Sequence, residues 1–152
     1  MAILEKLRGT SRPPVSLPSS SSEGCLEVVV LHTDTKGTLE ALKAAANLAQ
    51  GLTARIRLVV PQIVPYPLPV HAPDVPVSFT CRRFHALVSG ARIDTYVDIR
   101  LGREKREILE SALRPHSMVV MGGRRGWWPG RESRLADRLE RMGHHVVFAG
   151  AK

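Results

Sequence analysis

The sequence predicts an α/β fold in which five parallel strands form one sheet between two layers of helices, a three-layer doubly wound sandwich. Short β-branched runs alternate with helical patterns along the chain, the order typical of parallel βαβ units with right-handed crossovers. The length of 152 residues suits one such domain. Ligands of these sheets bind at the carboxyl ends of the strands, where the strand order reverses.

The first strand is expected at 26–31, where the run Leu-Glu-Val-Val-Val-Leu enters a polar loop. Thr38 is the expected N-cap of the helix that follows, and Gly51 is its expected left-handed C-terminal residue. A second strand is expected at 54–61. The prolines that follow it predict a long loop as far as about residue 75.

The remaining pattern predicts three more helices and three more strands. In chain order they are a helix at 78–89, a strand at 93–101, a helix that ends at Arg114, a strand at 117–121, a helix at 133–142 and a strand at 146–148. Gly90 and Gly143 are expected to close the first and last of these helices. The alternation of apolar and polar residues at 93–101 predicts a position toward a sheet edge.

Composition favours a cytoplasmic protein with no membrane span. The apolar runs are far shorter than the roughly 20 residues that a membrane helix needs, and the N-terminus has no signal-peptide pattern. Residues 1–24 include a Pro/Ser-rich stretch and are expected to form a disordered tail before a domain at 25–152. Cys25 and Cys81 form no metal or redox motif. The formal net charge of +8 favours an anionic ligand or partner.

Several segments in the correct order resemble the universal stress protein family, from Leu26 to Phe148. The segments are 30–42, 93–112, 118–124 and 135–139, which match the first strand with its aspartate loop, the stretch before the fourth strand, the fourth strand and the final helix. The resemblance implies the strand order 3-2-1-4-5. It also implies a homodimer formed through the last strand, which here contains Val146, Val147 and Phe148.

The ATP-binding branch of that family carries Gly, two residues, Gly, nine residues, Gly, then Ser or Thr. Glycines let the backbone approach phosphates, and the amides at the next helix's N-terminus face the anion. Here Gly123-Arg124-Arg125-Gly126 keeps the first spacing. Alignment from the strand end instead begins the motif at Gly122 and places Arg125 at the second glycine.

The second half of the motif departs from the family pattern. Ala136 follows Gly126 at the third glycine position, and alignment from the helix places Ser133-Arg134 where Gly-Ser is expected. Glu132 beside them would repel phosphate.

The resemblance also implies contacts to an adenosine group. Asp34 matches the family's aspartate in the adenosine pocket, Thr33 precedes it, and Val60 lies near the expected end of the second strand. The candidate cofactor is therefore ATP with magnesium. The competing interpretation is that Asp34 only caps the following helix.

The sharpest basic feature of the sequence is a row of arginines in the last helix, at helical spacing: Arg131, Arg134, Arg138 and Arg141. With Trp127 and Trp128 available for stacking, this face could bind RNA or single-stranded DNA. The alternative is a solvated face whose arginines pair with Glu132, Asp137 and Glu140.

Catalytic patterns are weak, so the chain is not expected to be an enzyme. His144 and His145 are adjacent and would point to opposite faces of a strand, and Ser117 and Ser133 have no visible base. The favoured function is a homodimeric regulatory or adaptor domain whose nucleotide site is altered or lost. The alternatives are a protein that binds ATP or another adenine nucleotide, and a nucleic-acid-binding module.

Overall fold

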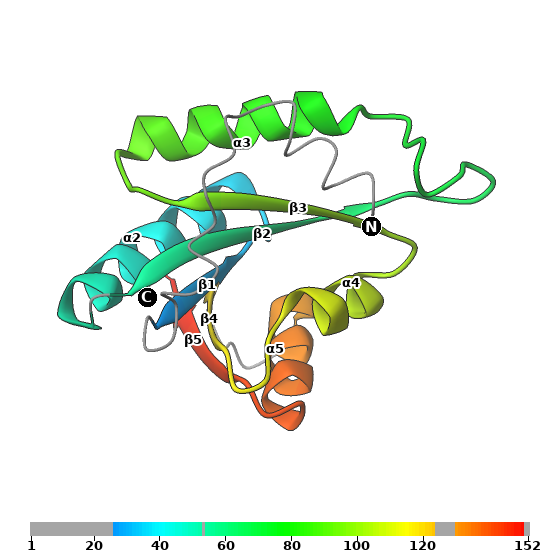
Figure 1. Cartoon of the computed structure of the whole chain (residues 1–152). Coiled ribbons are helices and arrows are strands. Elements are labelled where there is room, and N and C mark those ends of the chain that lie inside the picture. The colour runs from blue at the N-terminus through cyan, green and yellow to red at the C-terminus, as the bar shows by residue number, and fades with distance from the viewer. Residues whose placement is uncertain (1–25, 53, 124–129, 151–152) are drawn as a thin grey trace, which may run out of the picture.

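The computed structural model describes residues 26–52, 54–123 and 130–150, in which parallel strands alternate with helices (Figure 1). The strands are β1 (Glu27–Leu31), β2 (Arg55–Ile63), β3 (Tyr96–Gly102), β4 (Met118–Gly122) and β5 (His145–Ala149). The helices are α2 (Thr35–Leu52), α3 (Val77–Ala91), α4 (Lys105–Ala112) and α5 (Arg131–Arg141). The sheet order is β3-β2-β1-β4-β5, which confirms the predicted topology and the edge position of β3.

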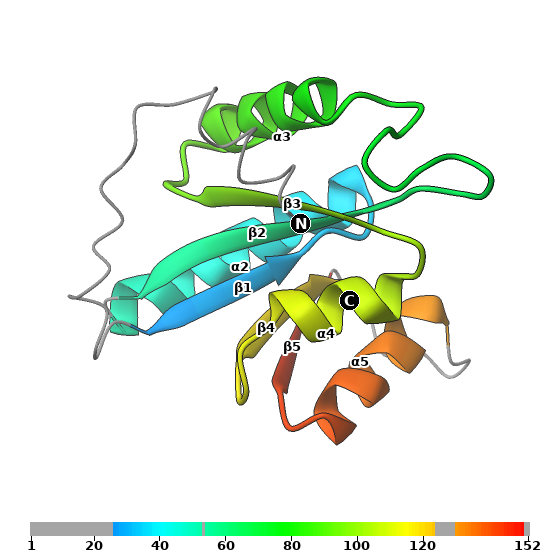
Figure 2. The same ribbon diagram turned by 45° about the vertical axis from the view of Figure 1, so that its right-hand side comes forward.

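Helices cover both faces of the sheet, α2 and α3 on one face and α4 and α5 on the other (Figures 1 and 2). Alternate residues of β1 point to opposite faces because the side-chain period of a strand is two. Val28 and Val30 pack in the core with α2 and α3, whereas Val29 and Leu31 pack in the core with α4 and α5. The three-layer sandwich is therefore confirmed.

Helix α2 begins earlier and ends later than predicted. Its N-cap interaction comes from Asp34, whose Oδ1 accepts a 2.6 Å hydrogen bond from the amide of Gly37. Thr38, the predicted cap, lies within the first helical turns and is buried. Gly51 is helical rather than left-handed, because α2 continues through it to Leu52.

The ends of α3 and α5 also differ from prediction. Gly90 lies inside α3, and the left-handed residue is Arg92, with φ of 57°. Helix α5 begins at Arg131 with Gly130 at its N-cap. As a result, Ser133 is a buried residue of the first turn instead of the first residue of the helix. Gly143 has the positive φ expected of a helix end.

Strand β2 runs past Pro61 to Ile63, two residues beyond its predicted end. Its pairing with β1 stops at Val59, while its pairing with β3 continues to Ile63. Pro61 therefore lies where β2 has become an edge on its β1 side, a position at which a residue without an amide hydrogen is tolerated.

Two of the sequence expectations concern parts of the chain that the structure does not describe. The tail predicted at 1–24 lies outside the described residues, as do Cys25, Trp127, Trp128 and the site candidates Arg124, Arg125 and Gly126. Among the described residues, no helix is both long enough and apolar enough to cross a membrane.

Candidate functional site

Three of the predicted site residues meet at the carboxyl ends of β1 and β4. Thr33 and Asp34 follow β1, and Gly122 ends β4. All three surround Gly37 in the first turn of α2: a Cβ atom built there would lie 2.8 Å from Thr33 Oγ1, 3.3 Å from Asp34 Oδ1 and 3.4 Å from the Cα of Gly122. This is the edge of the sheet at which doubly wound folds bind ligands.

Gly122 has a packing role at this edge. A Cβ atom on it would lie 2.2 Å from the carbonyl oxygen of Gly37, so the backbone of α2 rests directly on the end of β4. Gly123 differs, because its φ of 123° is a conformation that residues with a side chain rarely adopt. Gly123 follows the end of β4 directly, and we take it as the backbone candidate for contact with a ligand.

Asp34 and Thr33 have different environments. Asp34 is exposed while it caps α2, as the competing interpretation expected. The Thr33 hydroxyl is buried and has no hydrogen-bond partner among the described residues, although buried hydroxyls normally have one. A ligand that supplied a donor or acceptor here would satisfy that group.

Val60 is not part of this cluster. It is 3% exposed and packs in the core beneath α3, and β2 continues past it to Ile63. The sequence placed Val60 close to the strand end because the expected strand stopped at Pro61.

Glu132 occupies the start of α5. A Cβ atom on Gly123 would lie 3.6 Å from Glu132 Cγ, and one on Gly130 would lie 3.4 Å from Glu132 Oε2. The Glu132 side chain therefore lies beside both glycines, with its methylene carbons near Gly123 and its carboxylate near Gly130. It is in the first turn of the helix, where a negative charge is favoured by the helix dipole. Ser133, beside it, is 9% exposed, and Arg134 is exposed.

The sequence did not single out His32 or Lys105 as site residues. His32 follows β1 directly, its Nδ1 lies 2.7 Å from Thr38 Oγ1, and its ring meets Phe84 edge to face. The pKa of His32 is lowered to about 4, chiefly by burial and also by the positive charges of Arg83 and Lys105, while the negative charge of Asp34 acts in the opposite direction. His32 is therefore neutral near pH 7. The sequence signal that could have identified His32 as a site residue is its position, as a polar residue directly after a buried strand.

Lys105, the first residue of α4, links the two halves of the site. Burial lowers its pKa, while the negative charge of Glu132 raises it and Arg131 lowers it. The positive charge of the same lysine also lowers the pKa of His32, and the amino ends of α4 and α5 lie on the same side of the molecule (Figure 2). The site thus holds a mixed set of charges, in which Glu132 offsets the local positive charge.

The arginine row of α5 is exposed at all four predicted positions: Arg131, Arg134, Arg138 and Arg141. The two adjacent histidines have different environments, because His144 precedes β5 and His145 is its first residue. His144 is buried and its Nδ1 accepts a hydrogen bond from the Ser117 amide, whereas His145 is exposed. Within the described parts of the chain, no three potential metal ligands among His, Cys, Asp and Glu gather into a group.

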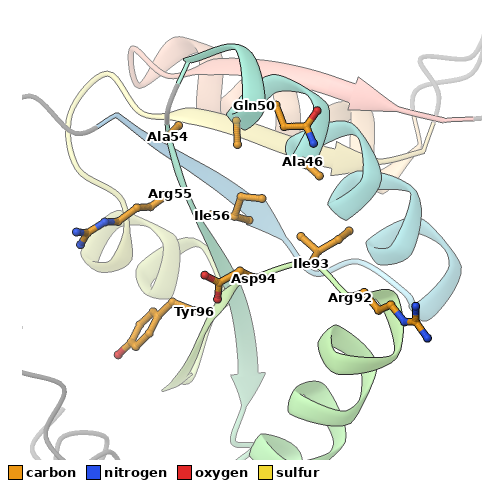
Figure 3. A pocket seen from close by; sticks show the side chains of 10 residues that line it. Ala46, Gln50, Ala54, Arg55, Ile56, Arg92, Ile93, Asp94 and Tyr96 are labelled. Carbon is orange, nitrogen blue, oxygen red and sulfur yellow. The ribbon is translucent and has the colours of Figure 1, made fainter.

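A separate open pocket of about 480 Å³ lies at the opposite end of the sheet (Figure 3). It is formed by the end of α2 and by the amino ends of β2 and β3, around Ile56 and Ile93. None of the predicted nucleotide-site residues lines it, so it is distinct from the cluster around Asp34 and Gly122.

Comparison with known proteins relates the chain to others through its fold alone. No family model and no curated protein matches the sequence. Among solved structures, the chain is similar to a universal stress protein crystallised in complex with cAMP. The TM-score is 0.51 at 15% sequence identity, and the match covers 84% of this chain and 99% of the other. The fold is therefore that of a universal stress protein.

Proposed function

We propose that this chain is a regulatory or adaptor domain of the universal stress protein type whose nucleotide site is altered so that ATP is not held. The fold supports the first half of this proposal, and Glu132 supports the second. At the amino end of α5 the Glu132 side chain lies beside Gly123, and its carboxylate lies near Gly130.

Glu132 opposes phosphate binding in three ways. Its negative charge repels a triphosphate bound nearby. Its carboxylate also lies in the first turn of α5, at the helix amino terminus that would otherwise attract an anion. In addition, its negative charge offsets the positive charge of Lys105. A triphosphate bound at Gly123 would therefore lie next to the Glu132 side chain.

The proposed adaptor role rests on a surface for protein–protein contact, the edge strand β5. Strand β5 forms one edge of the sheet, and Val146, Val147 and Phe148 on it are partly exposed. A second copy could extend the sheet or pack at this edge, since an edge strand carries backbone groups that are ready to pair. The expected assembly is a homodimer.

Adenine-nucleotide binding is the second candidate, and a specific observation favours it. The buried Thr33 hydroxyl without a partner lies beside exposed Asp34, in the position that the family resemblance assigns to adenosine. The similar universal stress protein is in complex with cAMP. A ligand with one negative charge would meet less repulsion from Glu132 than ATP would.

Calorimetric titration of the full chain separates the two candidates, with ATP and magnesium, cAMP and adenosine as ligands. The wild-type chain should give no saturable heat with millimolar ATP. Glu132→Gln keeps the size of the side chain and removes its charge, so it should bind ATP at least about tenfold more tightly, which corresponds to about 1.4 kcal/mol. Glu110→Gln, on the exposed face of α4, is the matched control and should change nothing. Micromolar ATP binding by the wild-type chain would overturn the proposal.

A further inference from the structure

The pocket at the amino ends of β2 and β3 has an apolar floor. Ala49 on α2, Ile56 on β2 and Ile93 before β3 line it, and Figure 3 shows the two isoleucine side chains in its middle. Charged side chains stand at its rim, among them Arg55 and Asp94. With a volume of about 480 Å³, it has room for a few aliphatic side chains, and we call it the amino-end groove.

Three large apolar side chains at the same end of the molecule are exposed. Leu26 is 55% exposed, Leu52 43% and Tyr96 38%. Leu26 precedes β1, Leu52 ends α2, and Tyr96 both begins β3 and lines the groove. Neighbouring apolar groups that remain exposed mark a surface on which another apolar segment binds.

The polypeptide enters the fold beside this groove. The amide of Arg55, at the groove rim, donates a 2.9 Å hydrogen bond to the carbonyl of Leu26. The 25 residues that precede Leu26 therefore start from the edge of the groove. Their first eight are Met-Ala-Ile-Leu-Glu-Lys-Leu-Arg, which is the apolar part of an otherwise Pro/Ser-rich stretch.

The composition of this octapeptide matches the groove. Ile3, Leu4 and Leu7 have the spacing of one helix face, which suits the aliphatic floor. Glu5 can pair with an arginine of the rim, Arg55 or Arg92, and the basic residues beside it can pair with Asp94. The same eight residues thus supply three apolar side chains and charges of both signs.

We propose that the amino-end groove is the binding site of the chain's own residues 1–8. The connecting segment, residues 9–25, has 17 residues and a root-mean-square reach of about 20–25 Å as a random coil, ample for a groove that adjoins its starting point. A tether of this length holds the segment at an effective concentration of about a millimolar, so weak affinity is enough for occupancy.

Hydrogen exchange on the full chain tests this proposal. The comparison is between the wild-type chain and the double variant Ile3→Asp/Leu4→Asp, which removes the apolar contacts without shortening the chain. Amides of 46–56 and 92–96 should exchange about tenfold faster in the variant. This is the change expected if residues 1–8 occupy the groove about ten times more often than they leave it, and the variant abolishes that occupancy. Val15→Asp/Leu17→Asp, in the connecting segment, is the matched control and should leave these rates unchanged.

A synthetic peptide of residues 1–10, added to the double variant, should restore the protection. Equal exchange in the wild-type chain and the Ile3→Asp/Leu4→Asp variant would overturn the proposal. So would a difference confined to another surface, such as residues 63–79. Protection that rises with protein concentration would identify a segment donated by a second copy, and would overturn binding within one chain.

Discussion

Arg57 on β2 donates a 2.9 Å hydrogen bond from Nη1 to Oδ2 of Asp98 on β3, where the two side chains are only 10% and 1% exposed. Arg57 also donates to the carbonyl of Ala112, at the end of α4, and to Glu27 on β1. Arg100 donates to the same aspartate. This buried charge cluster joins three strands to α4 on one face of the sheet.

Loss of the Arg57 side chain should destabilise the fold strongly. Arg57→Met leaves Asp98 buried beside a single arginine, and removal of one partner of a buried ion pair costs about 3–5 kcal/mol. Urea unfolding measures the change. Arg106→Ala, which breaks the exposed pair with Glu110, is the control and should cost no more than about 0.5 kcal/mol. If Arg57→Met lowered the free energy of unfolding by less than about 0.5 kcal/mol, the buried cluster would contribute little to stability.

Gly122→Ala should destabilise the protein because its Cβ would collide with the backbone of Gly37. Backbone atoms cannot move aside as a flexible side chain can, and overpacking of this kind costs about 1–3 kcal/mol. Gly51→Ala provides the contrast, since it lies in α2 with open space around it and should stabilise by about 0.4–1 kcal/mol. Thermal unfolding of both variants checks the prediction. Equal effects would contradict the close approach of α2 to β4.

The layers were predictable from sequence because five β-branched runs alternate with four helical spacings along the chain. The strand order followed from the resemblance to the universal stress protein family. Helix ends were less predictable. Thr38 and Asp34 are both good caps, and only the position of α2 against β4 shows that Asp34 has that role. Pro61 indicated a strand end because proline lacks the amide hydrogen that pairs strands. The sequence does not show that β1 ends before Pro61, which is what leaves room for this proline within β2.

The site was predictable only in part. Asp34 and Gly122 could be placed because each follows a recognisable strand. The electrostatic influence of Glu132 on Lys105 could not be predicted, because the two residues lie at the starts of two helices that are far apart in the sequence. Which charges face one another across a sheet edge depends on the packing of both helices, which no local pattern encodes.

His32 should make the protein less stable in acid. Its pKa is lowered to about 4 in the folded chain, whereas an unfolded histidine titrates near 6.5. Between these values the unfolded state binds more protons, so stability falls as the pH drops from about 6.5 to about 4. After allowance for solvent screening, the loss is on the order of 1–2 kcal/mol. Urea unfolding at several pH values in this range measures the free energy of unfolding. It should fall less steeply with decreasing pH for His32→Gln than for the control His71→Gln. An identical pH dependence in the two variants would contradict the lowered pKa of His32.

The proposed dimer can be tested at β5. Light scattering should give about twice the chain mass of 16.7 kDa for the wild type, because an edge strand is ready to pair. Val147→Lys places a charge at this edge and should shift the protein toward monomer. Val75→Lys, at an exposed apolar residue before α3, is the control. A monomeric wild type, or dimers unaffected by Val147→Lys, would exclude this interface.

The most direct test of the altered nucleotide site is thermal unfolding of the full chain with millimolar ATP and magnesium. Inorganic triphosphate and a short single-stranded DNA serve as controls for the basic surface. A ligand at 100 times its Kd adds about 2.7 kcal/mol, which raises the Tm of a domain of this size by about 5–10 °C.

A salt-sensitive rise with triphosphate and DNA alone would assign binding to the arginine row of α5. The proposed role of Glu132 predicts no rise with ATP. A saturable rise with ATP but not with triphosphate would contradict it and would establish a working adenosine site beside Asp34.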